Sequence, residues 1–164
     1  MKTFILVRHA KSNWDNPDLD DIDRPLNKRG LRDAPNMGKL LAEKGIKPDL
    51  IISSPAERAF TTAEFFAEAL DYPLENIRIE KLIYFAGFQE ITRMLSELAD
   101  SVSTVILFGH NPDITLLANV LSIAKIGNMP TCGIVCIDFK MEKWQQISEK
   151  KGILRFFEEP KRHD

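Results

Sequence analysis

Residues 1–15 read MKTFILVRHAKSNWD, and this stretch indicates the fold. Residues 3–7 have the apolar character of a strand buried on both faces, which is typical of a parallel sheet. The run ends abruptly in Arg8 and His9. Taken alone, an arginine at such a place is more often the partner of a carboxylate. In parallel α/β sheets, however, ligands bind beyond the carboxyl ends of the strands, so the pair is also a candidate for a functional site.

Strand-like and helix-like segments alternate along the rest of the chain. Apolar runs at residues 49–53, 77–79 and 104–108 have the length of strands, and the segments between them have helical spacing. This alternation predicts a single three-layer α/β domain, with a mostly parallel central sheet flanked by helices. We expect helices over residues 27–43, 54–70, 89–98 and 113–121, and a closing antiparallel pair of strands at 133–139 and 144–148.

The composition is typical of a soluble globular protein. Of the 164 residues, 44% are hydrophobic and 28% are charged, and the net charge is −2. We expect one domain over residues 1–157 and a frayed tail over residues 158–164. No basic field favours a nucleic acid or an anionic membrane, and no segment approaches the roughly 18 apolar residues of a transmembrane helix. We therefore expect a cytoplasmic monomer that binds neither.

Two cysteines, Cys132 and Cys136, lie in an apolar stretch. In a strand, their spacing would place both on one face. Two cysteines are too few for a cysteine-rich zinc site, and a disulfide framework is not indicated. We expect both side chains to be buried and unreactive, and we expect the protein to use no metal and no cofactor.

Two further strand ends carry unusual residues. The DLIIS strand runs into SSPAERAF, which places Arg58 about one turn into the next helix, and the TVILF strand ends in Gly109 and His110. If the three strands are neighbours, Arg58 and His110 converge with Arg8 and His9 at one edge of the sheet. A guanidinium matches phosphate oxygens with two parallel hydrogen bonds, and a neutral histidine nitrogen can attack phosphorus. The four residues together predict a phosphate site.

The motifs VRHAKS, SSPAERAFTTAE and FGHNPD resemble those of the histidine phosphatase superfamily, in its Arg-His-Gly branch. The form RHAKS, followed by DRPLNKRG, is similar to the small SixA-like phosphohistidine phosphatases. The resemblance spans nearly the whole chain and implies a phosphoglycerate mutase-like fold. It implies that His9 is the nucleophile and becomes phosphorylated. The residues that it implies as catalytic partners or phosphate contacts are Arg8, Arg58 and His110, with Arg24 as a further phosphate contact and Ser12 as either a phosphate contact or a loop cap.

The chain departs from this family pattern at two positions. Ala10 stands where the signature has glycine, which is a change between small residues. Relatives often carry a glutamate after a Leu-Tyr pair in mid-chain, and here that position is Phe85. The substitutes Asp15, Asp23 and Glu90 have the character of solvated surface carboxylates. General acid catalysis contributes typically about 10²–10⁴-fold, so an alcohol would leave slowly without an acid.

We therefore expect a metal-independent phosphatase that hydrolyses phosphohistidine, or a similarly activated phosphate. Its partner would be a phosphorylated protein of the histidine phosphotransfer type, or a small phosphorylated substrate. One alternative is a broad small-molecule phosphomonoesterase that uses Asp23 or Glu90 as its acid. Another is a non-catalytic phosphate-binding regulatory module, although a module of that kind would not need a nucleophilic histidine.

Overall fold

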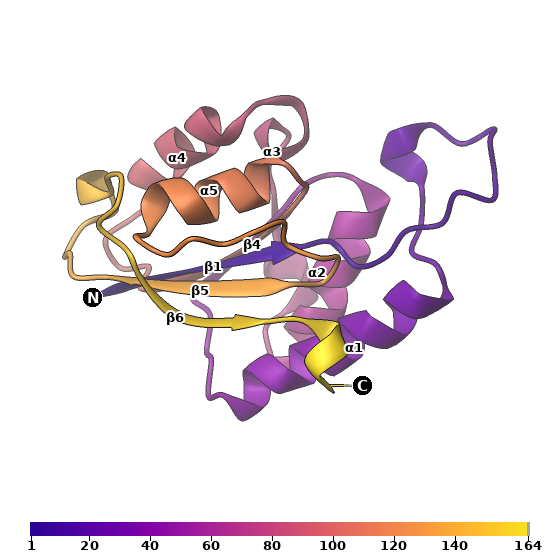
Figure 1. Ribbon diagram of the computed structural model, residues 1–164, viewed down its shortest axis with the longest axis horizontal. Coiled ribbons are helices and arrows are strands. Elements are labelled where there is room, and N and C mark those ends of the chain that lie inside the picture. The colour runs from indigo at the N-terminus through magenta and orange to yellow at the C-terminus, as the bar shows by residue number, and fades with distance from the viewer. Residues whose placement is uncertain (164) are drawn as a thin grey trace.

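The first strand lies in the interior of a six-stranded sheet with the order β3-β2-β4-β1-β5-β6 (Figure 1). The computed structural model describes residues 1–163. Parallel pairing joins β1 to β4, β4 to β2 and β2 to β3, whereas β5 runs antiparallel to both β1 and β6. The prediction of a mostly parallel α/β sheet is therefore confirmed. The strands are β1 (Lys2–Arg8), β2 (Leu50–Ser53), β3 (Arg78–Ile79), β4 (Thr104–Gly109), β5 (Ile134–Phe139) and β6 (Ile153–Glu158).

Helices cover both faces of the sheet, which gives the three layers that we predicted (Figure 1). The alternation within β1 shows why the strand is apolar throughout. Phe4 and Leu6 pack in the core beneath α4 and α5, whereas Ile5 and Val7 pack in the core against α1 and α2. The helices are α1 (Lys28–Glu43), α2 (Glu57–Ala69), α3 (Leu82–Phe85), α4 (Phe88–Ser96) and α5 (Asp113–Leu121).

The prediction of a strand at residues 144–148 is wrong. Residues Trp144–Gln146 form a short 3-10 helix, and the partner of β5 is β6, further along the chain. Trp144 is fully buried, and its indole nitrogen donates a hydrogen bond of 2.7 Å to the Val102 carbonyl. A buried indole needs such a partner. The apolar character of this segment therefore reflects one anchoring side chain rather than a strand.

The start of α2 also differs from the prediction. We expected the helix to begin at residue 54, where a serine is of the type that caps a helix, but α2 begins at Glu57, and its cap residue Ala56 has no side-chain cap bond. The Ser54 hydroxyl instead accepts a hydrogen bond from the Ala56 backbone N–H and bonds the ring of His110. The serine is thus part of the turn that links β2 to the site.

Other expectations agree with the structure. Asn27 caps α1 by accepting a hydrogen bond from the Gly30 backbone N–H. Cys132 and Cys136 are both buried, and burial raises the pKa of the Cys136 thiol to about 12. Among residues 1–163, no helix combines the length and apolar character that crossing a bilayer requires.

The end of the chain is more ordered than a frayed tail. Glu158 is the last residue of β6, and residues Pro160–His163 form a 3-10 helix. The ring of His163 lies 2.5 Å from the Glu158 carboxylate. Asp164 lies outside the described residues.

Candidate active site

The carboxyl ends of β1 and β4 bring the two site histidines together. Arg8 pairs with Gly109 across the parallel ladder, and the backbone N–H of His9 donates to the Gly109 carbonyl at 3.1 Å. The ring centroids of His9 and His110 are 5.2 Å apart. The three strands are neighbours in the sheet, with β4 between β1 and β2. The parallel register of β1 and β4 sets the spacing of the rings.

The ring of His9 is buried and held in one tautomer. Its Nδ1 lies 2.7 Å from the Ala10 carbonyl oxygen. A carbonyl oxygen only accepts, so Nδ1 carries the proton and Nε2 carries the free electron pair. Burial, together with the charges of Arg58 and Arg8, lowers the pKa of His9 from 6.5 to about 4. The imidazole is therefore neutral near pH 7 and has a nucleophilic nitrogen.

A threonine of α2 fixes the backbone that follows His9. The Ala10 N–H donates to the Thr62 hydroxyl at 3.0 Å, and that hydroxyl donates to the Arg58 carbonyl at 2.7 Å. Thr62 is fully buried. The nucleophile loop and the helix that carries Arg58 thus share one hydrogen-bonded link, and sequence reasoning did not single out this residue.

Three buried nitrogen atoms at the site have no hydrogen-bond partner among the described residues. They are Nε of Arg8, Nε of Arg58 and Nδ1 of His110. Other nitrogen atoms of these side chains have partners. Arg8 donates to the Met129 carbonyl at 2.9 Å, and His110 Nε2 lies 2.8 Å from the Ser54 hydroxyl. Buried polar atoms without partners are uncommon. Oxygen atoms of an anion would satisfy both arginine nitrogens, and also His110 Nδ1 in the tautomer in which His110 Nε2 accepts from the Ser54 hydroxyl.

His110 is neutral, as His9 is. Burial is the main cause that lowers the pKa of His110 to about 3, and the nearby His9 and Arg58 lower it further. Two neutral rings and two guanidinium groups therefore form the centre of the site. This arrangement provides fixed positive charge and also leaves an unprotonated nucleophile, because burial, with the arginine charges as a smaller contribution, keeps the histidines from binding protons.

The segment between β1 and α1 places Arg24 beside this centre. Its side chain is buried and donates to the Ser12 hydroxyl at 2.8 Å and to the Asp21 carboxylate at 3.1 Å. The guanidinium carbon lies 3.4 Å from the ring centroid of Trp14. Ser12 therefore contacts Arg24 in this structure, and a phosphate contact by either residue stays a prediction.

Asp21 and Tyr84 are site residues that sequence reasoning missed. The Asp21 carboxylate accepts hydrogen bonds from Arg58 at 2.9 Å and from the Tyr84 hydroxyl at 2.7 Å. The Tyr84 ring packs edge-on to His110, with 5.5 Å between the centroids. Asp21 stands three residues before Arg24, and this spacing in DIDR is the only local signal for the ion pair.

The carboxylates that we weighed as proton donors do not join this network. Asp15, Asp23 and Glu90 are all exposed. Phe85, at the position where relatives often have a glutamate, is 71% exposed and packs its ring edge-on to Tyr84.

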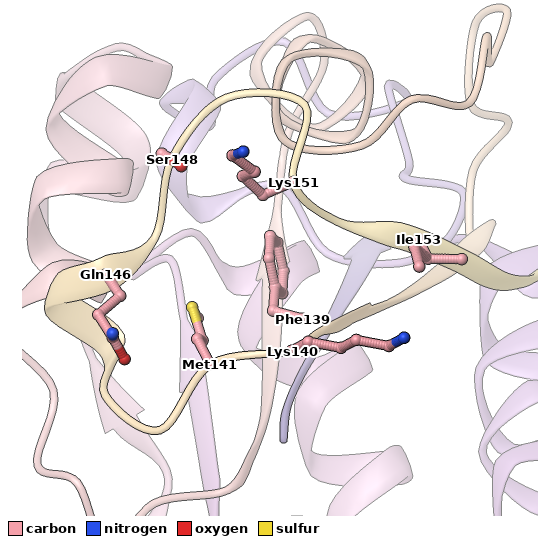
Figure 2. Close-up of a pocket in the computed structure, with 7 residues that line it drawn as sticks. All are labelled: Phe139, Lys140, Met141, Gln146, Ser148, Lys151 and Ile153. Carbon is pink, nitrogen blue, oxygen red and sulfur yellow. The ribbon is translucent and has the colours of Figure 1, made fainter.

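The hollow drawn in Figure 2 lies at the opposite end of the sheet. Phe139, in its lining, pairs with Lys2 at the start of β1, whereas the site lies beyond Arg8 at the end of that strand. Its charged lining residues are Lys140 and Lys151, and no histidine or carboxylate lines it. Among the described residues, no group of three or more histidine, cysteine, aspartate or glutamate side chains has the arrangement of a metal site.

Comparisons with known proteins show the family and the fold of the chain. An uncharacterised chloroplast protein of Arabidopsis thaliana is 30% identical over 92% of this chain and 72% of its own length. The structure of SixA from Agrobacterium tumefaciens has a TM-score of 0.80 and 27% identity, covering 97% of this chain and 98% of that one. A structure of the protein histidine phosphatase SixA with tungstate has the same fold, with a TM-score of 0.78 at 18% identity over 99% of each chain. Residues 4–83 match the sequence profile of the histidine phosphatase superfamily, branch 1. With its RHA motif, its fold and these relatives, the chain belongs to the histidine phosphatase superfamily.

Proposed function

We propose that this protein hydrolyses phosphohistidine, or a similarly activated phosphate, on a protein, and that His9 is transiently phosphorylated. The observation that carries the proposal is the set of unpartnered buried nitrogens on Arg8, Arg58 and His110, beside a neutral His9. A phosphoryl group accepts hydrogen bonds at three peripheral oxygens and carries negative charge. Donors and charge of this kind are what phosphoryl transfer needs most.

The first step would be attack on phosphorus by Nε2 of His9. Its electron pair forms a new P–N bond while the P–N bond to the substrate ring breaks. A substrate ring that carries a proton on its second nitrogen leaves as neutral imidazole. His9 Nδ1 keeps its proton and donates it in a hydrogen bond to the Ala10 carbonyl, which keeps Nε2 directed at the phosphoryl group.

The second step would be hydrolysis of the phosphorylated His9. Water attacks phosphorus from the side opposite to His9 Nε2, the P–N bond breaks, and the electron pair returns to the nitrogen. Both protons of the water leave with the product as dihydrogen phosphate. Arg8 and Arg58 would stabilise the charge on the phosphoryl oxygens in both steps.

The carboxylate nearest to the chemistry supports a substrate with a good leaving group. Asp21 accepts hydrogen bonds from Tyr84, Arg58 and Arg24, which hold the pKa of its carboxyl well below the usual range. It is therefore ionised near pH 7 and has no proton to donate. An alkoxide needs such a proton, whereas a protonated imidazole does not.

A phosphorylated protein of the histidine phosphotransfer type is the proposed partner, and a small phosphorylated molecule is the simpler substitute. Trp14, which stacks on Arg24, is 70% exposed, and Phe85 is 71% exposed. Exposed aromatic residues on both sides of a site are suited to contact with another protein surface.

The test is a comparison of leaving groups. We expect phosphoramidate and a phosphohistidine peptide to be hydrolysed, with acid-labile phosphate trapped on His9 after rapid quenching. p-Nitrophenyl phosphate should react more slowly, and an alkyl phosphate more slowly still. A chelator should leave the rates unchanged.

Efficient alkyl phosphate hydrolysis would instead favour the phosphomonoesterase alternative, with Asp23 or Glu90 as the acid. Binding of inorganic phosphate without any turnover would favour the regulatory module. Full turnover by His9→Ala would exclude His9 as the nucleophile.

A further inference from the structure

Asp21 joins three separate elements of the site. It lies in the short 3-10 helix Asp21–Asp23, within the segment that projects beyond the carboxyl end of β1 (Figure 1). One carboxylate oxygen accepts from Arg24 at 3.1 Å. The other accepts from Arg58 of α2 at 2.9 Å and from Tyr84 of α3 at 2.7 Å.

Arg58 contacts both the backbone and the side chain of Asp21. Arg58 Nη1 donates to the Asp21 carbonyl oxygen at 2.7 Å, while Nη2 donates to the carboxylate. Asp21 therefore holds both terminal nitrogens of the guanidinium. The Nε of Arg58 is buried and has no hydrogen-bond partner among the described residues.

We propose that Asp21 is a positioning residue, which orients Arg58 and Arg24 toward the phosphoryl group and, through Tyr84, fixes the ring of His110. This inference rests on the proposed function, because it assigns the phosphoryl group to the unpartnered nitrogens. Asp21 itself does not touch the reacting atoms.

The geometry distinguishes this role from that of a carboxylate that merely occupies the phosphate position. A competing carboxylate would be expected to bond the buried site nitrogens, but Arg58 Nε and His110 Nδ1 remain without partners among the described residues. The ring of Tyr84 also depends on Asp21, because its hydroxyl donates to the same oxygen that holds Arg58. A single carboxylate thus sets three of the side chains that surround the phosphoryl position.

The negative charge of Asp21 also stabilises the arrangement of the arginines. The positive charges of Arg58, Arg8 and Arg24 all lower the pKa of His9, which shows that they act on the same small region. Their mutual repulsion would spread them apart in the absence of an anion. A fixed carboxylate between two of them offsets this repulsion and keeps them ready to bind phosphate.

The experiment compares Asp21→Asn with the matched control Asp20→Asn. Asp20 is the exposed neighbouring residue, and its side chain makes no cap hydrogen bond. For each variant we would measure kcat and KM with phosphoramidate, the dissociation constant of inorganic phosphate by titration calorimetry, and the melting temperature. A small misplacement of a group that orients the substrate can cost about 10²-fold in rate.

We expect Asp21→Asn to lower kcat by about 10- to 100-fold and to weaken phosphate binding by about tenfold, with Asp20→Asn unchanged. Tyr84→Phe keeps the ring and removes only the hydroxyl, so it should give a smaller loss. The double variant should lose less than the product of the two single losses, because both changes act on one network.

Two results would overturn the inference. Tighter phosphate binding and a lower KM in Asp21→Asn would show that the carboxylate competes with the substrate. Unchanged kcat and phosphate affinity, with only a lower melting temperature, would show a purely structural role. If the unaltered protein hydrolyses neither phosphoramidate nor phosphohistidine, the proposed function fails, and the phosphate titration still decides the role of Asp21.

Discussion

The two parts of the site are held by different forces. At the strand ends, backbone pairing sets the positions, because Arg8 lies opposite Gly109 and the two histidines follow directly. In the segment between β1 and α1, charged side chains set the positions, and Asp21 is the common partner. A substitution at the strand ends should therefore remove a reacting group and leave the positions of the other site residues unchanged. A substitution in the segment between β1 and α1 should instead displace the site residues and keep the reacting groups.

The largest effect is expected at the strand end. His9→Ala should lower kcat for phosphoramidate by at least about 10³-fold, because loss of a nucleophile removes the covalent step altogether. Rapid-quench trapping of acid-labile phosphate and steady-state rates measure this. His163→Ala is the control, since that ring lies near the end of the chain and contacts the Glu158 carboxylate. Acid-labile phosphate on the His9→Ala variant would contradict the assignment.

Arg58 bonds Asp21 and is also a proposed phosphate contact, so its substitution tests both parts of the site. Arg58→Lys keeps a positive charge but loses the planar fork that bonds Asp21 and that we propose to contact the phosphoryl group. We expect kcat/KM for phosphoramidate to fall by about 10²-fold. Arg93→Lys is the control, because Arg93 is an exposed residue whose nearest carboxylate, on Glu97, is 3.8 Å away. Equal rates in the two variants would show that charge alone suffices.

Arg24 should give a smaller effect, because its charge acts less strongly on His9 than the charges of Arg58 and Arg8 do. Arg24→Ala removes the bond to Ser12 and one of the partners of Asp21. We expect kcat/KM to fall by about tenfold, mostly through KM, if Arg24 assists phosphate binding. A loss as large as that of Arg58→Lys would place Arg24 in direct contact with the phosphoryl group. No loss at all would remove it from the site.

The same comparison explains what the sequence predicted and what it did not. Arg8, His9 and His110 were predictable because a strand followed by a polar residue is a local pattern, and parallel strands end at one edge. Asp21 and Tyr84 were not predictable because they are 63 residues apart and meet only through the folded chain. Side chains in loops carry no periodicity that marks their direction.

Errors in the fold have a similar origin. The residue Trp144 has the apolar character of a strand residue, but its burial depends on Val102, which is 42 residues away. Ser54 has the type of a helix cap, but the ring of His110 competes for its hydroxyl. In both cases a distant partner decided the local conformation, and propensity alone does not contain that information.

Lowering the pH should affect the stability contributions of the two parts of the site differently, because the histidines at the strand ends and Asp21 in the segment between β1 and α1 titrate in different pH ranges. The pKa values of His9 and His110 fall from 6.5 to about 4 and about 3 in the folded protein. Below pH 6.5 the unfolded chain binds protons at both rings and the folded protein does not. As the pH is lowered from 6.5 to about 4, the free energy of unfolding should therefore fall by about 1.4 kcal/mol per pH unit for each ring.

Asp21 behaves in the opposite way, because its pKa is lowered from an unfolded value of 3.8. Its contribution is fully present above that pH and is lost only in stronger acid. Urea unfolding of the unaltered protein, His9→Asn, His110→Asn and Asp21→Asn at pH 7 and pH 5 tests this. Each histidine variant should lose about half of the pH dependence, whereas Asp21→Asn should keep all of it. If Asp21→Asn instead loses the dependence between pH 7 and 5, the segment and the strand ends are coupled through protonation, and the two parts of the site form one unit.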